Sequence, residues 1–391
     1  MIKNAVADRM YLLEGESAFT VLARARALED QGRHIIHMEI GQPDFNTPPN
    51  IIEAGCRAIT GGYTGYTPAP GYPELRQTIT DYALRQKGVT ASKDDVIVAT
   101  GTKPVIFYTI LMLVNPRDEV IYPNPGFPAY NSCIQFAGGV PVPLNFSAKN
   151  DFRLDLDEFE KLITKKTKLV IINSPSNPTG GVFTREDIEG IAKILKKHED
   201  IFILSDEIYD RLVYDEEVYS IAAVPGFKDR TIIADGLSKA YAMTGWRLGY
   251  GIMHPKLAKH MELLVINSNS CAAAFTQIAA IEALNGPQDA VESMGDAFLK
   301  RRNYLVDALN TIKGINCRTP KGAFYVFPNI SSFGLPCEVF AERLLNEAGV
   351  AASWGTAFGS FGEGHIRLSY ATSLDNIELA VERIEKFTKT F

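Results

Sequence analysis

The stretch TIIADGLSKAYAMTGWRLG, residues 231–249, decides how the rest of the chain is interpreted. It begins with the small and β-branched run Thr231–Ala234, which predicts a short buried strand. Ser238 and Lys239 follow the end of that strand, and Arg247 comes after one short loop. In an open α/β sheet, ligands bind at the carboxyl ends of the strands. A lysine held there away from water is neutral and nucleophilic more often than one on the surface. Taken alone, the stretch fits a solvated lysine and arginine beside a glycine turn better than a ligand site, and the rest of the chain is what raises the odds of a ligand site.

Strands and helices alternate on both sides of this stretch. Apolar runs bounded by turn residues predict six further strands, at Asp95–Ala99, Glu119–Tyr122, Val140–Leu144, Leu169–Asn173, Ile201–Ser205 and Tyr250–Met253. Helices fit between several of them, at Pro104–Leu113, Glu186–Lys197 and Pro255–Ile266. Pro104 suits the first helical position, where no N–H is needed. Repeated β-α-β units with buried strands predict an α/β fold with a doubly wound, mostly parallel sheet.

The pattern changes after Gly286-Pro287. A long predicted helix over Ala290–Leu309 is followed by short strands and helices, at Phe324–Phe327, Cys337–Glu347, His365–Ser369 and Leu374–Phe391. This order is typical of an α+β unit. Near the other end of the chain, apolar residues at helical spacing predict a helix over Ala18–Leu28. We expect a large domain over residues 48–288 and a smaller one over residues 289–391, with an N-terminal arm, residues 1–47, that packs as part of the smaller domain.

Composition and charge disfavour several classes of function. The 391 residues are 46% hydrophobic and 22% charged, as in ordinary globular proteins. A net charge of −6 disfavours nucleic-acid binding. We see neither an apolar run long enough for a bilayer nor a signal-peptide core, so we expect a cytoplasmic protein without a membrane partner. The five cysteines lack CxxC spacing, which favours free thiols. His34 and His37 would face opposite sides of a strand, so we expect no metal.

Three further polar stretches follow predicted strands. Gly101 and Thr102 open a helix, where backbone N–H groups attract phosphate, although no P-loop motif is present. Prolines on both sides of Asn177 hold its side chain rigidly. Asp206 ends an apolar strand, where a carboxylate is costly unless a cation pairs with it, and Tyr209 lies three residues further on. Each stretch alone also fits a structural turn or a helix cap. Their common position at strand ends favours one shared site.

These residues resemble, in order and spacing, the fold-type-I aminotransferases that use pyridoxal 5′-phosphate (PLP). The resemblance is carried by five residues, Asn177, Asp206, Tyr209, Lys239 and Arg247. It extends from the segment Gly41–Phe45 to the segment His365–Tyr370. It is greatest to the aspartate and broad-specificity aminotransferases of bacteria and archaea.

The resemblance implies a set of residues around the cofactor. Lys239 would hold PLP as a Schiff base and, once substrate displaces it, carry the proton between the substrate Cα and the cofactor. Asp206 would pair with the pyridinium nitrogen. Asn177 and Tyr209 would bind the 3′-oxygen, and Phe127 would stack on the ring. The phosphate would lie among Gly101, Thr102, Ser238, Arg247 and the Tyr66 of a neighbouring subunit.

The Tyr66 assignment implies a homodimer with shared active sites. It agrees with the loop over residues 60–73, which is rich in glycine, proline and tyrosine and is typical of a functional or interfacial segment. Gly236 departs from the many relatives that have a serine there, three residues before the lysine.

The resemblance also implies how substrates bind. Arg367 would hold the substrate α-carboxylate with its planar guanidinium, and Gly41 would let the N-terminal segment close against the substrate. Asn177 would also line this side. Lys103 would meet a distal carboxylate, as of aspartate or glutamate, although a solvated helix-start lysine is an equally simple interpretation. Phe19 and Tyr66 would instead suit apolar or aromatic side chains.

The function that the resemblance implies is transfer of an amino group from an L-amino acid to a 2-oxo acid, first of all 2-oxoglutarate. Aspartate-type or broad specificity fits Lys103, and an alanine or aromatic/kynurenine aminotransferase remains open. A PLP-dependent C–S β-lyase also remains open, because it uses the same site. A PLP-fold transcription regulator is disfavoured, since the aminotransferase pattern is already under way at Gly41 and leaves no room for a DNA-binding domain.

Overall fold

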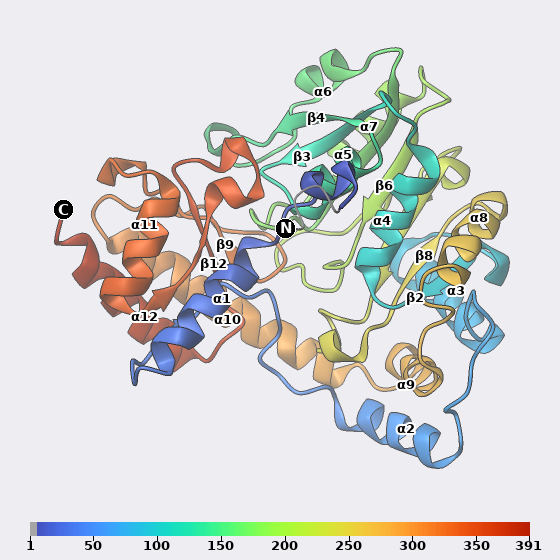
Figure 1. The fold of residues 1–391 in the computed structure, drawn as a ribbon, viewed down its shortest axis with the longest axis horizontal. Helices are drawn as coiled ribbons and strands as arrows, with labels where there is room; N and C mark the ends of the chain where they lie inside the picture. The colour runs from blue at the N-terminus through green and yellow to red at the C-terminus, as the bar shows by residue number, and fades with distance from the viewer. Residues whose placement is uncertain (1–5) are drawn as a thin grey trace.

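The computed structural model describes residues 6–391. A seven-stranded sheet carries the elements around residues 231–249, and the C-terminal elements lie beside it with two smaller sheets (Figure 1). The large sheet has the strand order β2-β8-β7-β6-β5-β3-β4. Its strands are β2 (Val96–Ala99), β3 (Glu119–Asn124), β4 (Val140–Asn145), β5 (Thr167–Asn173), β6 (Phe202–Asp206), β7 (Thr231–Gly236) and β8 (Gly249–Ile252). Only β8 is antiparallel to its neighbours, which confirms the α/β fold with a mostly parallel sheet.

Helices cover both faces of this sheet, because successive strand residues point to opposite sides. On one face, Leu204 and Ile232 pack with α4 (Thr102–Leu113), α5 (Ala129–Phe136) and α8 (Pro255–Ile266). On the other face, Ile203 packs with α6 (Leu156–Leu162) and α7 (Arg185–Leu195), and Ile233 packs with α3 (Pro73–Lys87) and α9 (Ala274–Asn285). An outer helix, α2 (Pro49–Thr60), lies against α9. Because helices cover both faces of the sheet, the side chains on both sides of each strand are buried, and the strands are therefore continuous apolar runs in the sequence.

The start of α4 differs from the expectation. The helix begins at Thr102 and not at Pro104, so Pro104 is its third residue. The first N–H groups of a helix have no acceptor within it, and proline is therefore tolerated throughout the first turn. Gly101 precedes the helix with φ of 107°, a conformation that other residues rarely adopt. This turn directs the amino end of α4 toward the carboxyl ends of the strands.

The C-terminal elements form a second core. They are α10 (Asp289–Thr311), β9 (Tyr325–Val326), α11 (Cys337–Arg343), β10 (Val350–Ala351), β11 (Ser353–Trp354), β12 (Ile366–Ser369) and α12 (Leu374–Thr388). The predicted helix over Cys337–Glu347 is α11 followed by a wider π-type segment, Leu344–Ala348. Strand β12 lies between β11 and β9 in an antiparallel sheet.

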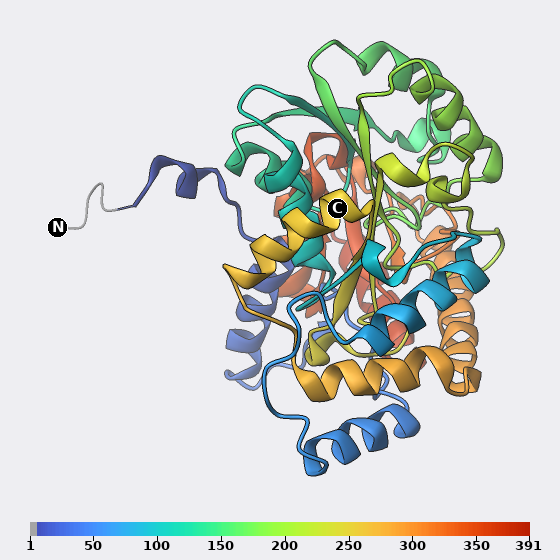
Figure 2. The same cartoon turned by 90° about the vertical axis from the view of Figure 1, so that its right-hand side faces the viewer.

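The N-terminal segment packs on these C-terminal elements. Strand β1 (Ile36–His37) pairs in parallel with β10, and α1 (Ser17–Glu29) packs Val21 and Ala25 against Leu345 and Ala351. The short 3-10 helix Asp8–Leu12, which precedes α1, lies against α5 and projects from the body of the molecule (Figure 2). The domain boundaries after residues 47 and 288 stay predictions. Across residues 6–391, no helix combines the length and the apolar character needed to cross a bilayer.

Candidate active site

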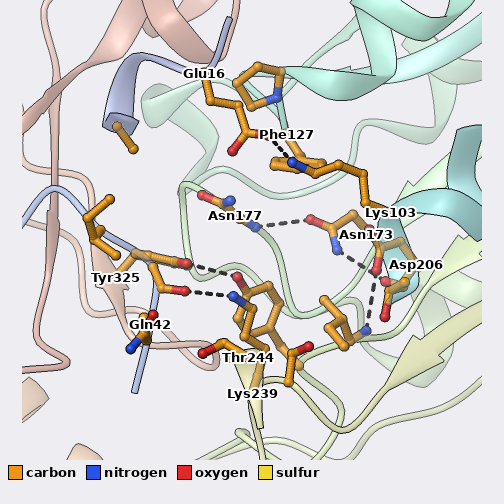
Figure 3. A pocket seen from close by; sticks show the side chains of 18 of the residues that line it. Glu16, Gln42, Lys103, Phe127, Asn173, Asn177, Asp206, Lys239, Thr244 and Tyr325 are labelled. Carbon is orange, nitrogen blue, oxygen red and sulfur yellow. Dashed lines mark hydrogen bonds and ion pairs between the residues drawn. The ribbon is translucent and has the colours of Figure 1, made fainter. Parts of the chain in front are cut away.

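A cavity of about 650 Å³ lies where β5, β6 and β7 end (Figure 3). The C-terminal elements contribute Tyr325, Phe358 and Arg367 to its wall, and α1 contributes Phe19. The cavity brings together most of the predicted site residues, namely Phe19, Gly41, Thr102, Lys103, Phe127, Asn177, Asp206, Tyr209, Ser238, Lys239, Arg247 and Arg367. Gly101 and Tyr66 do not line it.

Lys239 lies in the loop directly after β7, and its Nζ donates a hydrogen bond to the carbonyl oxygen of Gly41 at 2.6 Å. Removal from water, followed by the positive charges of Arg367, Lys103 and Arg247, lowers the pKa of Lys239 to about 8. A lysine with such a pKa has a much larger neutral, nucleophilic fraction at neutral pH than a surface lysine has. The surroundings of Lys239 therefore favour its neutral, nucleophilic form.

Asp206 is buried at the end of β6, with 3% of its surface exposed. Its carboxylate accepts hydrogen bonds from the hydroxyl of Tyr130 at 2.7 Å and from the N–H of Ile208 at 3.3 Å. Burial raises the pKa of Asp206 to about 6. Within residues 6–391, no lysine or arginine forms an ion pair with this carboxylate, which leaves it available to a cationic ligand. Asp206 is thus suited to bind a cationic group in the cavity.

Asn173, the last residue of β5, is a residue that the sequence analysis did not single out. Its side-chain amide donates to the backbone oxygen of Asp206 at 3.1 Å, and its side-chain oxygen accepts from the N–H of Asn177 at 3.0 Å. It therefore holds the Asn177 turn against the end of β6 (Figure 3). The signal for Asn173 was the one that identified Asp206, namely a polar residue that ends an apolar strand.

The amino end of α4 and Arg247 form an anion cradle. Arg247 has φ of 54° and donates to the carbonyl oxygens of Thr244 at 2.9 Å and Thr100 at 3.2 Å. A Cβ at Gly101 would lie 2.5 Å from the Arg247 Nη2, so only glycine allows this approach. Backbone N–H groups at a helix start and a guanidinium together attract a phosphate.

The structure explains why residue 236 is a glycine in this chain. A Cβ at Gly236 would lie 2.6 Å from the Oγ1 of Thr102 and 2.9 Å from the Cα of Gly249. The Thr102 hydroxyl instead donates to the carbonyl oxygen of Asp235 at 3.0 Å. The departure from the family pattern therefore brings α4 close to β7.

Arg367, on β12, reaches the large sheet from the C-terminal side. Its Nη1 donates to the side-chain oxygen of Asn177 at 3.0 Å, its Nη2 donates to the backbone oxygen of Glu39, and its Nε is buried without a partner in the described residues. The ring of Tyr325 lies 4.5 Å from the guanidinium carbon. A buried guanidinium with an unused donor suits a carboxylate ligand.

Two predicted contacts remain peripheral in this single chain. Tyr66 is 90% exposed in the loop after α2, outside the cavity, so its contact with a neighbouring subunit stays a prediction. Phe19 lines the mouth of the cavity but is 61% exposed.

Tyr209, which lines the cavity, shares a hydrogen bond of 2.8 Å with Tyr325, another residue that local sequence did not reveal.

A buried ion cluster lies beneath the loops that carry Asp206 and Lys239. The Nζ of Lys87, at the end of α3, lies 2.8 Å from Glu207, 2.7 Å from Asp210 and 3.0 Å from Asp235. Glu207 and Asp210 belong to the loop after β6, and Asp235 lies on β7. One ammonium group therefore ties together the two chain segments that present the carboxylate and the lysine.

Replacing Lys87 with methionine will lower the free energy of unfolding by about 3–5 kcal/mol, because three carboxylates stay buried without their cation. Urea unfolding followed by circular dichroism measures this change. Lys161→Met, at an exposed lysine on α6, is the matched control and will change the unfolding free energy little. Equal stability of the two variants would show that the cluster does not hold these loops.

Comparison with known proteins agrees with this geometry. The family model for aminotransferases of class I and II matches residues 33–384. An aspartate aminotransferase of Bacillus sp. (strain YM-2) is 40% identical, over 99% of this chain and 100% of its own length. The aspartate/prephenate aminotransferase of Cereibacter sphaeroides is 38% identical, over 98% of each chain. Among solved structures, the aspartate aminotransferase of Thermus thermophilus with maleate superposes with a TM-score of 0.94, at 36% identity, over 97% of this chain and 99% of the other.

The fold and the match over most of the chain define the class of protein. The chain belongs to the class I and II aminotransferases, and it is a transaminase.

Proposed function

We propose that this transaminase uses PLP to transfer the amino group of an L-amino acid to 2-oxoglutarate, with aspartate-type or broad specificity. The observation that carries the proposal is the convergence of three groups in one cavity. They are the Lys239 amine with its lowered pKa, the buried Asp206 carboxylate and the Arg367 guanidinium. A transaminase needs a nucleophilic amine, a partner for a cationic ring and a carboxylate site, and these three residues meet those needs.

The residues of the cavity fit PLP. The cradle of Gly101, Thr102 and Arg247 suits its phosphate, and Ser238 lies beside it in the wall. Asp206 would bind the ring nitrogen, because a cationic partner offsets the cost of burying the carboxylate. Asn177 and Tyr209 would bind the ring oxygen, and Phe127 would lie against the ring. When bound, PLP supplies an electron sink for the electron pair that is left when the Cα–H bond breaks.

Lys239 would have two tasks. Its Nζ would bond covalently to the cofactor, and after the substrate takes that place the free amine would take the proton from the substrate Cα and return it later. A lysine with a pKa of about 8 can perform both steps near neutral pH. Gly41, whose carbonyl oxygen accepts the hydrogen bond from Nζ, would hold the amine on this side of the cavity.

Substrate choice would depend on the mouth of the cavity. Arg367 would bind the α-carboxylate of donor and acceptor alike. Lys103 lines the cavity and would meet a distal carboxylate, which agrees with relatives named for aspartate. Phe19 and Phe127 also line it and keep alanine or aromatic donors open. C–S β-elimination stays the second candidate for the same residues.

We also propose that the enzyme acts in the cytoplasm as a homodimer, built from the two domains defined above. The support for the dimer is Tyr66, whose side chain is almost fully exposed in a glycine- and proline-rich loop. In a homodimer, the phenol of Tyr66 would contact the phosphate cradle of the second copy, as the family resemblance implies. Sedimentation velocity checks the assembly, and a stable monomer with full activity would contradict it.

A panel of single half-reactions tests the proposed function. The PLP-loaded enzyme will convert the cofactor to its amine form with glutamate and aspartate, and 2-oxoglutarate will restore it. Replacing Lys103 with alanine will lower the preference for aspartate over alanine about tenfold, because a charged hydrogen bond is lost. Alanine, phenylalanine, methionine and kynurenine complete the panel, read by absorbance.

Two results would contradict these expectations. Absence of the amine form with every donor would reject transamination by this site, and release of pyruvate and ammonia from cysteine conjugates without an oxo acid would favour the β-lyase. An unchanged aspartate-to-alanine preference in Lys103→Ala would remove Lys103 from the substrate site.

A further inference from the structure

An ion pair crosses the mouth of the cavity. Glu16, the residue that precedes α1, pairs with Lys103 in the first turn of α4, and both residues line the cavity (Figure 3). The Lys103 Nζ lies 5.5 Å from the centre of the Phe127 ring. The Lys103 side chain is 49% exposed and that of Glu16 is 24% exposed. A carboxylate of the protein itself is thus paired with the cation that, in the proposed function, would face the substrate side chain.

The two partners belong to different parts of the fold. Helix α1 packs on the C-terminal elements through Val21 and Ala25, whereas α4 packs on the large sheet. Before α1, the short 3-10 helix Asp8–Leu12 is exposed and lies against α5, and the Glu14 N–H donates a hydrogen bond of 3.0 Å to Ser132 on α5. The pair therefore joins α1 to α4 across the cavity through one partly exposed ion pair, which costs little to break.

Transamination places a particular demand on this cation. One cavity has to accept the amino donor and the oxo-acid acceptor in turn, and their side chains differ in charge. A dicarboxylic substrate brings a carboxylate for Lys103, but an apolar side chain brings none. Without Glu16, an apolar substrate would leave the ammonium group beside it partly desolvated and unpaired.

We propose that Glu16 is a specificity-determining residue that occupies Lys103 in place of a substrate carboxylate. Dicarboxylic substrates displace the Glu16 carboxylate from Lys103, and substrates with uncharged side chains leave the pair intact. The inference rests on the proposed function, because it assumes that Lys103 faces the substrate side chain. Glu16 would thereby allow one cavity to accept both dicarboxylic substrates and substrates with uncharged side chains.

The test compares two non-reacting ligands on the PLP-loaded enzyme by calorimetry. Succinate represents the dicarboxylic class and 3-phenylpropionate the apolar class. In Glu16→Gln, succinate will bind about two- to fivefold more tightly, since it no longer competes with an internal carboxylate. The affinity for 3-phenylpropionate will stay the same or fall. In a Lys103→Met background, Glu16→Gln will leave succinate binding unchanged.

Glu14→Gln is the matched control, because it removes an equal charge from the same exposed segment, and Glu14 forms no ion pair in the described part of the chain. It will change neither affinity. Four results would overturn the proposal: unchanged succinate binding in Glu16→Gln, weaker succinate binding, equal tightening of both ligands, or an effect that persists without Lys103.

The same samples separate this inference from the proposed function. If no amino donor changes the cofactor absorbance of the wild-type enzyme, the proposed function fails, whatever the binding data show. If donors react normally and the affinity for succinate is the same in Glu16→Gln and the wild type, the proposed function stands and the role of Glu16 is rejected.

Discussion

Replacing Lys239 with alanine will lower the rate of transamination by about 10⁴-fold or more, because in the proposed function one side chain would have both the covalent and the proton-carrying task. Among residues 6–391, no other lysine lies in a comparable position. The other lysine that lines the cavity, Lys103, is half exposed and paired with Glu16. The Lys239 amine lies against the Gly41 carbonyl beside the rings of Tyr209 and Phe324, and its pKa is lowered to about 8.

The rate with glutamate and 2-oxoglutarate, measured together with the visible absorbance of the bound cofactor, checks this expectation. Lys239→Ala will lose both, while its thermal unfolding will stay close to that of the wild type. Lys161→Ala, at an exposed lysine on α6, will retain both. Retained absorbance together with retained turnover in Lys239→Ala would show that Lys239 is assigned wrongly.

Replacing Arg367 with methionine will raise the activation free energy that corresponds to kcat/KM by about 3–5 kcal/mol for every amino donor. This is a loss in kcat/KM of roughly a hundred- to several-thousandfold. The guanidinium is buried, its carbon lies 4.5 Å from the ring centre of Tyr325 and 4.8 Å from that of Phe358, and its Nε has no partner in the described residues. Because all donors and acceptors have an α-carboxylate, the loss will not depend on the substrate side chain. This separates Arg367 from Lys103, whose replacement changes the preference among donors.

Steady-state kinetics with aspartate, alanine and phenylalanine measure this effect, and cofactor absorbance shows whether the site remains assembled. Arg318→Met is the control, because Arg318 pairs with Asp151 outside the cavity. A large loss with aspartate alone would place the distal carboxylate, and not the α-carboxylate, on Arg367.

The parts of this fold with strong local signals could be predicted from the sequence. The strands of the large sheet are continuous apolar runs, and helix α8 has its predicted bounds, Pro255–Ile266, because proline opens it. Helix α3 was not predicted, although its sequence has similar signals, with Pro73 at its start and Gly88, at φ of 65°, after its end. Helix α9 is apolar on nearly all sides because it is buried, so it lacks the periodic contrast of a surface helix.

The contacts that complete the site could not be predicted, because they join distant parts of the chain. Strand β1 is two residues long and gains its partner only from β10, more than 300 residues later. Glu16 meets Lys103, and Tyr130 meets Asp206, only after α1 and α5 have packed. Polar residues at strand ends are visible locally, but the partners that complete them depend on tertiary packing.

The central claim is that Lys239 is the residue that bonds to PLP, and borohydride trapping tests it most directly. Reduction of the PLP-loaded wild-type enzyme makes the bond between lysine and cofactor permanent, and peptide mapping by mass spectrometry then identifies the modified lysine. We expect the label on Lys239 alone, at one per chain. A label on another lysine, or none despite bound PLP, would contradict the account.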